Sequence, residues 1–457
     1  MCPTVSETEP EVPDVLELQV GDVANGGFCV ARYEGRVVFV RHALPGERVR
    51  ARVTERAKNY LRADAVDIIE ASPDRVEPPC PFAGPGRCGG CDWQHASLPA
   101  QRALKASVVE EQLRRLAGIT RTVVVEEVPY PVDGDTDAGL VPPPGLGWRT
   151  RVQFAVSGGT VGLRKHRSHD IEPIDECLIA HPGVELMGIE RKRWPGASGV
   201  EGVVSAATGD RLVVLRGRDR RKIRVPRLDV PVRLVRGKPE PGAALPYVRE
   251  SVSGRLFQVS GSGFWQVHPG AAQLLADAVL DALEPKPGDI ALDLYCGVGL
   301  FAGVLADRIG REGLVVGVES DGQAVRDARF NLRDLPNVSI ERGPVEEIIA
   351  ELEFGRADAS SRTQNKRGGT GHQGGSRVRR ADLVVLDPPR TGAGRDVVEH
   401  ITRLAGRKIA YVSCDPATLA RDLAYFGERG WTLDTLRAFD AFPMTRHVEL
   451  LATLVRG

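Results

Sequence analysis

The sequence predicts an α/β protein whose C-terminal part, residues 256–457, forms a doubly wound, Rossmann-like sheet. Short apolar runs alternate there with helix-like stretches, and they cover residues 290–295, 314–319, 338–340, 381–386 and 408–412. A helix over 271–283 precedes the first run, and a pair of antiparallel strands over 431–439 and 448–455 follows the last. A glycine-bearing turn follows the first strand, and polar residues follow the fourth and fifth. Ligands of open α/β sheets bind at this edge.

Composition is that of an ordinary globular chain. The 457 residues have a formal net charge of zero, 42% are hydrophobic and 27% are charged. The length predicts two to four domains, and any nucleic-acid binding must come from local basic patches. No run of about 18 apolar residues occurs, so we expect no membrane span. Residues 1–13 predict a disordered acidic tail rather than a signal peptide, which favours a cytoplasmic protein.

Residues 14–75 predict a small β-barrel. Strand-like runs cover 16–20, 37–40 and 49–53, and glycine- or proline-containing turns separate them. Short strands at this spacing are typical of small barrels. The segment resembles a TRAM domain, an OB-like RNA-binding barrel, at Gly26-Gly27, residues 38–40, residues 44–47 and residues 72–75. The resemblance implies that arginines of this domain contact RNA phosphates.

Four of the eight cysteines form a candidate metal site in the central region, residues 76–255, which predicts an α+β domain. The spacing of Cys80, Cys88 and Cys91 allows three thiolates to converge, and Cys177 is the fourth candidate. In a reducing compartment such a group indicates a metal rather than disulfides. Four thiolates suit either tetrahedral zinc or an iron–sulfur cluster, and the spacing alone does not choose between them.

Three further segments have distinctive patterns. Residues 98–117 predict a helix with an apolar stripe of Leu104, Val108, Leu113 and Leu116, ended by Gly118. Residues 164–169 form a dense basic patch after two predicted strands, which we interpret as an RNA contact; a solvated sheet edge is the alternative. Residues 357–380 are rich in Ser, Gly, Gln and Arg, and predict a disordered insert to which we assign no function.

The turn over residues 293–299 indicates a nucleoside cofactor. Gly297 and Gly299 let the backbone approach a ligand closely after the first strand. The third glycine of a dinucleotide fingerprint is absent, so the turn is weak support for NAD. Glu319, at the end of the second strand, is placed to bind ribose hydroxyls. Together these features fit S-adenosylmethionine, and the alternative role for Glu319 is a helix cap.

Carbon methylation is the chemistry that the remaining motifs favour. Asp387 ends the fourth strand and is followed by two prolines and Arg390, whereas enzymes that methylate amino groups place an aromatic residue there. Cys414 ends the fifth strand. Uracil C5 is a poor nucleophile, but addition of a thiolate at C6 makes C5 enolate-like. A base must then remove the C5 proton, and Glu449, at the start of the last strand, is the candidate.

The chain resembles the RNA uracil-C5 methyltransferases that pair a TRAM domain with an iron–sulfur cluster, such as the bacterial 23S ribosomal RNA enzymes. The resemblance covers nearly all of residues 14–457, and its most specific motifs are residues 264–266, 293–299, 387–390, 413–416 and 442–449. It implies a class I methyltransferase domain over 256–457, with Cys414 as nucleophile and Glu449 as base. It further implies contacts to cofactor or base by Gln266, Tyr295, Glu319 and Asp387, and a [4Fe–4S] cluster on Cys80, Cys88, Cys91 and Cys177.

The resemblance sets the expected substrate and the alternatives to it. We expect 23S ribosomal RNA as substrate and a monomeric enzyme, with transfer RNA as the alternative because tRNA enzymes share the catalytic motifs. A non-catalytic RNA-binding or RNA-chaperone protein is a different possibility, which the presence of Cys414 and Glu449 disfavours. The chain departs from the family in a longer gap between the first two cysteines and in the insert over 357–380.

Overall fold

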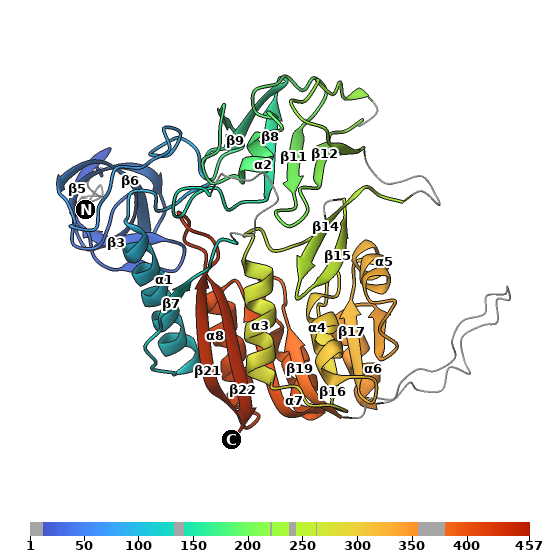
Figure 1. Cartoon of the computed structure of the whole chain (residues 1–457). Helices are drawn as coiled ribbons and strands as arrows, with labels where there is room; N and C mark the ends of the chain where they lie inside the picture. Colours follow the sequence, from blue (N-terminus) through green and yellow to red (C-terminus); the bar gives the residue numbers. More distant parts are fainter. Residues whose placement is uncertain (1–11, 132–140, 220–221, 237–243, 262, 355–379) are drawn as a thin grey trace, which may run out of the picture.

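The computed structural model describes residues 12–131, 141–219, 222–236, 244–261, 263–354 and 380–457 (Figure 1). They form an N-terminal domain of strands, a central sheet and a C-terminal layered α/β domain. Nearly all of the predicted tail, residues 1–13, and of the predicted insert, residues 357–380, lies outside the described residues, so both stay predictions. No helix in the described part of the chain is long and apolar enough to cross a membrane.

The N-terminal domain is one six-stranded sheet with the order β1-β5-β6-β4-β3-β2. Alternate residues of each strand point inwards, as the period of two of a strand requires; Val38, Val40, Leu61 and Ala63 are fully or almost fully buried. The sequence predicted β1, β4 and β5 but did not locate β3 or β6. The strands are β1 Val15–Gln19, β2 Val23–Ala24, β3 Phe28–Tyr33, β4 Arg36–Arg41, β5 Arg48–Arg56 and β6 Tyr60–Glu70.

The central region contains a second six-stranded sheet, ordered β10-β9-β8-β11-β12-β13, and a short hairpin of β14 and β15. Trp148, Phe154 and Trp194 are buried in the core beneath this sheet. The elements are β8 Arg151–Ser157, β9 Thr160–Arg164, β10 Ile171–Pro173, α2 Pro182–Glu185, β11 Gly199–Val204, β12 Arg211–Arg216, β13 Arg233–Val235, β14 Tyr247–Val252 and β15 Arg255–Ser260.

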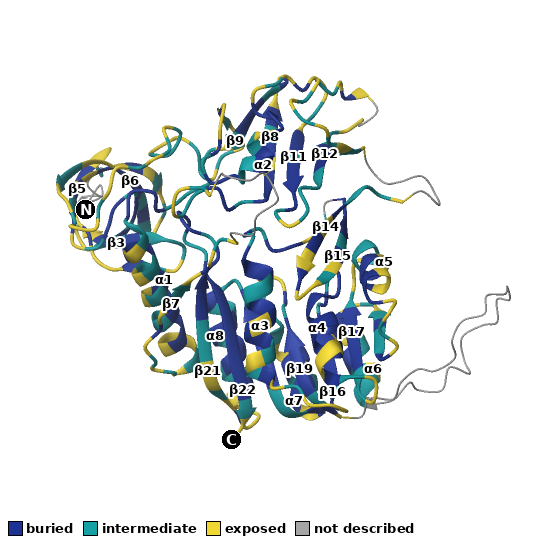
Figure 2. Ribbon diagram, in the orientation of Figure 1, coloured by how far each residue is buried: buried dark blue, intermediate teal, exposed yellow. Residues whose placement is uncertain are grey.

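The C-terminal domain is an eight-stranded sheet, ordered β18-β17-β16-β19-β20-β22-β21-β7. Helices cover both faces: α3, α4 and α5 pack on one, and α6, α7 and α8 on the other (Figures 1 and 2). The elements are α3 Ala271–Leu283, β16 Ile290–Leu294, α4 Leu300–Ile309, β17 Leu314–Glu319, α5 Gly322–Asn331, β18 Val338–Arg342, α6 Val345–Phe354, β19 Ala381–Leu386, α7 Gly394–Leu404, β20 Ala405–Ser413, α8 Pro416–Gly427, β21 Trp431–Asp440 and β22 Glu449–Arg456.

Most of this domain was predictable from the sequence. The predicted doubly wound α/β sheet is present, and the predicted bounds of α3, β17 and β19 match those of the structure. The long apolar runs of β17 and β19 mark strands that are covered on both faces. The eighth strand, β7 Val125–Glu127, was not expected, because it comes from the central region and pairs in parallel with β21.

A long helix joins the N-terminal and C-terminal domains. Helix α1, Leu98–Gln112, continues as a π-helical turn over Leu113–Ala117, and Gly118 ends it in the left-handed conformation, with φ of 66°. Val108 packs in the N-terminal core and Val109 in the C-terminal core. Of the predicted stripe, Leu116, which lies within the π-helical turn, is exposed and Leu113 is buried.

Candidate active site

Four predicted site residues gather at one edge of the C-terminal sheet. Strands β16, β19 and β20 are parallel, and Leu294, Leu386 and Tyr411 are neighbours near their ends. Tyr295, Asp387 and Cys414 follow these strands and therefore share one edge. Glu449 begins β22, which runs antiparallel to β20 with Leu450 opposite Ser413. A strand that runs the opposite way thus brings its first residue to the place where the others bring their last.

Cys414 lines a pocket that opens to solvent. The other walls come from distant parts of the chain: Asn25, Gly26 and Gly27 of the N-terminal domain, Trp93 beyond the cysteine segment, and Arg390, Arg446 and His447. Helix α8 begins directly behind the cysteine, where the Asp415 carboxylate accepts hydrogen bonds from the backbone N–H groups of Ala417 and Thr418 at 3.1 and 2.9 Å. This cap fixes the end of the strand that holds the thiol.

The groups around the Cys414 thiol shift its pKa in opposite directions. Its pKa is raised to about 11, chiefly by burial and also by the nearby carboxyl groups of Glu449 and Asp387. Arg390 acts in the opposite direction, through its charge and a hydrogen bond to the sulfur. A thiolate is the nucleophilic form of cysteine. Arg390 is therefore the group on this edge that favours a reactive sulfur. The sequence motif contained Arg390, but we used it only to exclude methylation of amino groups.

Glu449, which is buried, and Asp387, which is half-buried, form a pair of neighbouring carboxyl groups. Burial raises the pKa of Glu449 well above its usual range; Asp387 raises it further and Arg390 lowers it. Burial also raises the pKa of Asp387, to about 7. Two neighbouring carboxylates resist being charged together, so this edge holds at least one proton near neutral pH. Perturbed carboxyl groups of this kind are common where proteins carry out acid–base chemistry.

The cofactor turn has the backbone shape that its glycines predicted. Tyr295, Gly297 and Gly299 have φ of 65°, 55° and 90°, in the left-handed region that favours glycine. A Cβ at Gly299 would lie 2.7 Å from Leu332, so a side chain there would clash with α5. A Cβ at Gly297 would meet nothing within 4 Å, which leaves the backbone open to a ligand. Tyr295, half-buried, has a pKa raised by burial to about 12.

Two carboxylates line this turn. Glu319 accepts hydrogen bonds from the backbone N–H groups of Gly297, at 3.1 Å, and Asp321, at 2.7 Å. Asp293 is fully buried; one of its oxygens accepts from the N–H of Ala302 at 2.7 Å and the other has no hydrogen-bond partner. Burial raises the pKa of Asp293 well above its usual range, and the charges of Asp387 and Glu319 add to the effect. Acidic groups therefore run from the cofactor turn towards Cys414.

Gln266 lies in the segment that leads into α3. Its side chain is buried. Trp265, before it, packs on Phe257 with ring centroids 5.6 Å apart, whereas Phe264 is 71% exposed. The carbonyl of Val267, after it, accepts two hydrogen bonds from Thr150 of the central region, both at 2.9 Å. The segment is thus firmly held, and the contact of Gln266 with a cofactor stays a prediction.

The loop before Glu449, residues 441–448, is held from outside its own domain. The carbonyl of Met444 accepts hydrogen bonds from the backbone N–H groups of Asp92 and Trp93, both at 3.0 Å. The N–H of Met444 donates to the side chain of Gln101 in α1 at 2.7 Å. His447 sits at the cavity wall, and burial together with the charge of Arg446 lowers its pKa to about 3. His447 is therefore uncharged at neutral pH, as a packing residue would be.

The four candidate metal ligands line one pocket. Burial is the main cause that raises the pKa of Cys177, to about 12, and that of Cys91 still more, and the charges of neighbouring cysteines add to the effect at both. Across the described residues, no three His, Cys, Asp or Glu side chains are placed to hold a metal ion. His95 is buried, and its ring nitrogen lies 3.4 Å from the carbonyl of Ala43.

Comparisons with known proteins agree with this architecture. Residues 248–456 match the model of the tRNA (uracil-5-)-methyltransferase family, and residues 11–66 match that of the TRAM domain. The chain is 51% identical to an uncharacterised RNA methyltransferase of Streptomyces coelicolor, over 98% of this chain and 94% of that one. It is also 51% identical to one from Streptomyces avermitilis, over 96% and 97% of the two chains.

Among solved structures, the fold is similar to that of the Pyrococcus abyssi tRNA (uracil-54, C5)-methyltransferase in complex with S-adenosyl-L-homocysteine. The TM-score is 0.63 at 23% identity, over 96% of this chain and 99% of that chain. The match extends the likeness beyond the C-terminal sheet to the whole arrangement of domains. The chain therefore belongs to the RNA methyltransferases; its residues 248–456 match the uracil-5 methyltransferase family, and it has a TRAM domain at its N-terminus.

Proposed function

We propose that this enzyme methylates C5 of a uridine in RNA through a temporary bond between the Cys414 sulfur and C6 of the base. The observation that carries the proposal is the meeting of Cys414, Glu449 and Arg390 at one sheet edge beside the cofactor turn. A base admitted to the cavity that Cys414 lines would have a thiol on one side of its ring and a buried carboxyl group nearby.

The chain's residues divide the reaction between them. The Cys414 thiolate, favoured by Arg390, bonds to C6, and the electrons of the C5–C6 double bond shift towards C4 and its oxygen. S-adenosylmethionine, when bound, supplies the methyl group that C5 takes. Glu449 then accepts the C5 proton, the C5–C6 double bond forms again, and the thiolate leaves. The thiolate is regenerated, so the net products are the methylated uridine, the demethylated cofactor and one proton.

The raised pKa of Glu449 suits this role. A carboxyl group with an ordinary pKa is too weak a base to take a proton from carbon at a useful rate, whereas a buried one binds the proton more tightly. The same burial keeps Glu449 protonated in the free protein. A protonated Glu449 no longer repels negative charge on Cys414, so thiolate formation comes first and Glu449 must lose its proton before the last step.

The cofactor turn fits a nucleoside with a sulfonium group. Gly297 leaves open space beside the backbone, Glu319 offers carboxylate oxygens for ribose hydroxyls, and Asp293 has a buried oxygen without a partner. Gln266 and Tyr295 would complete the contacts that the family motifs imply. These residues would bind and orient the cofactor, and the fold places their turn on the same sheet edge as Cys414.

We also propose a [4Fe–4S] cluster on Cys80, Cys88, Cys91 and Cys177. Support comes from the shared cavity and from the chemistry of four thiols, which suits iron–sulfur clusters. A zinc ion is the alternative with the same ligands. The proposed role is structural, because Cys91 precedes the Asp92–Trp93 segment that binds the loop before Glu449. Iron with acid-labile sulfide in anaerobically purified protein would support the cluster, and zinc in its place would exclude it.

For the substrate we propose 23S ribosomal RNA, and transfer RNA as the second candidate. The combination of a TRAM domain with four clustered cysteines supports the first. The similar Pyrococcus abyssi structure, which is a tRNA enzyme, supports the second. We propose further that the protein is a cytoplasmic monomer, since both RNAs and reduced thiols occur in the cytoplasm. The domain boundaries after residues 13, 75 and 255 remain our proposal; the last of them coincides with the start of β15.

The test is covalent capture together with site mapping. Wild-type protein should form an adduct with RNA that contains 5-fluorouridine, because fluorine at C5 blocks the step assigned to Glu449. Cys414→Ala should form none, while Cys29→Ala, a buried cysteine of the N-terminal core, should behave as wild type. Mass mapping of ribosomal and transfer RNA from cells without the gene would identify the target. Methylation that persists in Cys414→Ala would exclude the mechanism, and a non-catalytic RNA-binding protein would give neither adduct nor product.

A further inference from the structure

One outer face of the N-terminal domain carries aromatic side chains where solvent-facing residues would be expected. Phe28 of β3, Phe39 of β4, and Tyr60 and Arg62 of β6 are half-buried, while the residues that alternate with them fill the core. The pairing places Phe39 directly beside Arg62. We call these four residues the aromatic face. Because they alternate with core residues, they lie on the outside of the sheet.

The four side chains form one stacked group. The rings of Phe28 and Phe39 have centroids 6.2 Å apart, and those of Phe39 and Tyr60 are 5.6 Å apart. The guanidinium carbon of Arg62 lies 4.9, 5.4 and 5.1 Å from the centroids of Phe28, Phe39 and Tyr60. Such cation–π contacts hold a planar cation over aromatic rings. The group is therefore an ordered surface rather than a set of separate side chains.

The opposite side of the same domain shows what an ordinary outer face looks like. On β1 and β5 the outward positions are charged and exposed, including Glu17, Arg50 and Arg52. Arg50 pairs with Asp67 at 2.9 Å, at the solvent surface. Aromatic rings that stay partly accessible on the outer face of a soluble domain are candidates for an interaction site. The concentration of rings on β3, β4 and β6 is thus specific to one side.

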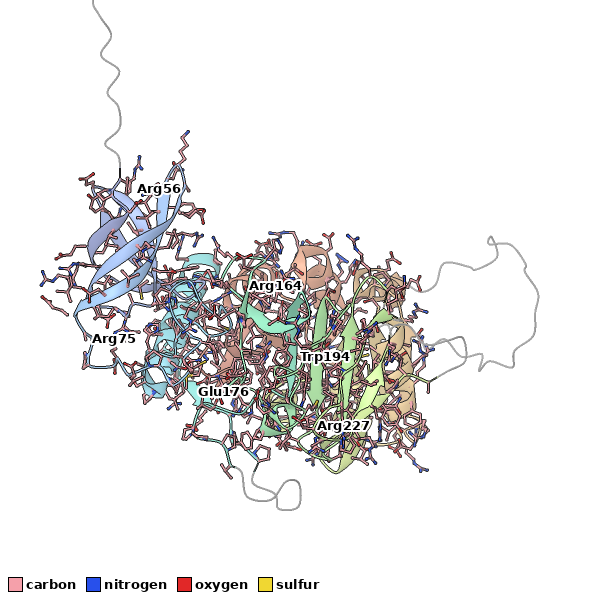
Figure 3. All side chains as sticks on the ribbon, turned by 90° about the horizontal axis from the view of Figure 1, so that it is seen from above. Arg56, Arg75, Arg164, Glu176, Trp194 and Arg227 are labelled. Carbon is pink, nitrogen blue, oxygen red and sulfur yellow. The ribbon has the colours of Figure 1, made fainter. Side chains whose placement is uncertain are left out.

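Positive charge surrounds the aromatic face. The turn between β9 and β10 brings His166 to Phe28, with ring centroids 6.2 Å apart. Burial lowers the pKa of His166 to about 4, and the charges of Arg41, Arg167 and Arg446 lower it further. Glu55 contacts both Arg62 and Arg167 at 3.2 Å and so joins the two domains. Figure 3 shows Arg164, at the start of that turn, on the side of the central region that faces the N-terminal domain.

The aromatic face continues into the wall of the cavity that holds Cys414. Gly26 and Gly27, which precede Phe28, line that cavity. A Cβ at Gly26 would lie 2.9 Å from the Phe28 ring, and one at Gly27 would lie 2.8 Å from the Arg446 side chain. Both glycines have positive φ. A single tight turn therefore separates the rings from the reaction site.

We propose that the aromatic face stacks an unpaired base of the substrate RNA that flanks the uridine in the cavity, while Arg167 and Arg446 contact the phosphates on either side. This rests on the proposed function and adds a second base-binding subsite to it. Rings and planar guanidinium groups are the surfaces on which single-stranded nucleic acids stack, and arginines bind their phosphates. If the flanking base were paired in a duplex, its faces would be stacked on neighbouring bases and could not stack on the aromatic rings.

The test uses short single-stranded RNA with one uridine and 2-aminopurine at successive neighbouring positions, because the fluorescence of 2-aminopurine falls when it stacks. Phe39→Leu/Tyr60→Leu keeps apolar volume but removes two rings. We expect about tenfold weaker binding and loss of quenching at one position, as stacking on aromatic side chains contributes on this scale. Phe330→Leu is the matched control: Phe330 is 48% exposed and stacks with Arg333 at 4.1 Å, but lies on α5 of the C-terminal domain.

Salt dependence separates stacking from charge. Phe39→Leu/Tyr60→Leu should leave the slope of log Kd against log salt unchanged, whereas Arg446→Gln should lower it by about one phosphate contact. Tyr60→Phe keeps the ring and should bind as wild type even if the double variant is unstable. Unchanged affinity and quenching in the double variant, or an equal loss in Phe330→Leu, would overturn the subsite. If the subsite failed these tests, methylation of cellular RNA by the wild-type protein would still support the proposed function. Absence of that methylation would exclude the proposed function itself.

Discussion

A buried ion pair between Lys105 of α1 and Asp440 at the end of β21 should be the strongest single link between the helix and the C-terminal sheet. The Lys105 side chain is 0% exposed and that of Asp440 2%. The ammonium group also donates to the carbonyl of Phe442 at 3.0 Å. Burial lowers the pKa of Lys105, and the Asp440 carboxylate opposes the shift. The Asp440 carboxylate therefore stabilises the charged form of the buried Lys105 ammonium.

Lys105→Met tests the link. It keeps most of the apolar stem but leaves the Asp440 carboxylate and the Phe442 carbonyl buried without the ammonium. Breaking a buried ion pair by removing one partner costs about 3–5 kcal/mol, and at a few degrees per kcal/mol this predicts a fall in Tm of about 5–15 °C. Asp440→Asn should have a similar effect, because it leaves the ammonium without its counter-charge.

The double variant Lys105→Met/Asp440→Leu gives the sharper result. Replacing both charges by apolar groups is often neutral, so only the donor to Phe442 is missing, at about 1–3 kcal/mol. The double variant should therefore be more stable than either single one. The assay is thermal unfolding, with hydrogen exchange of residues 441–448 as a local measure, because unfolding of several domains need not be two-state. Additive losses in the double variant, or a fall below about 1 °C in Lys105→Met, would refute the reasoning.

Three further predictions concern the site. Arg390→Gln should raise the pKa of the Cys414 thiol above about 11 and slow capture of 5-fluorouridine RNA at pH 8, while Arg390→Lys keeps most of the rate; capture rates between pH 7 and 9 check this. Glu449→Gln should trap a stable adduct with ordinary uridine RNA, visible on denaturing gels. Because the folded state raises the pKa of Glu449, wild type should lose stability as pH rises above about 4.3; Glu449→Gln should lose less, measured by melting at pH 5 and 8. Cys88→Ala should lose bound iron, whereas Cys29→Ala should keep it, measured by iron and sulfide analysis.

The sequence was sufficient for the parts of the fold with long periodic signals. The strands β17 and β19 could be located from the sequence, because strands that are buried on both faces appear as continuous apolar runs. Once these strands are known to be parallel, Asp387 and Cys414 must share an edge. Strand β7, with three residues, has no such repeat. It depends on the edge that β21 offers, which lies more than 300 residues away in the sequence.

The walls of the pocket were harder to predict than the sheet edge on which Asp387 and Cys414 lie. Gly26, Trp93 and Arg446 belong to three regions, and only tertiary packing brings them around Cys414. Lys105 is an example of the difficulty: a lysine within a helix is normally solvent-exposed, and its partner Asp440 lies 335 residues away. Arg390 was available three residues after Asp387, and a positive charge beyond the strand next to that of Cys414 was a signal for a group that opposes the rise in the thiol pKa.

The composition of the cavity wall implies that RNA recognition and chemistry are coupled. The C-terminal domain supplies Cys414, Glu449 and the cofactor turn, but Gly27 and Trp93 close the cavity from the other side. Trp93 donates through its ring nitrogen to the carbonyl of Gly27 at 3.1 Å and through its backbone to Met444. A single residue thus binds both the N-terminal turn and the loop before Glu449. If bound RNA displaced the N-terminal domain, the two hydrogen bonds of Trp93 would therefore transmit the movement to the loop before Glu449 without involving the sheet.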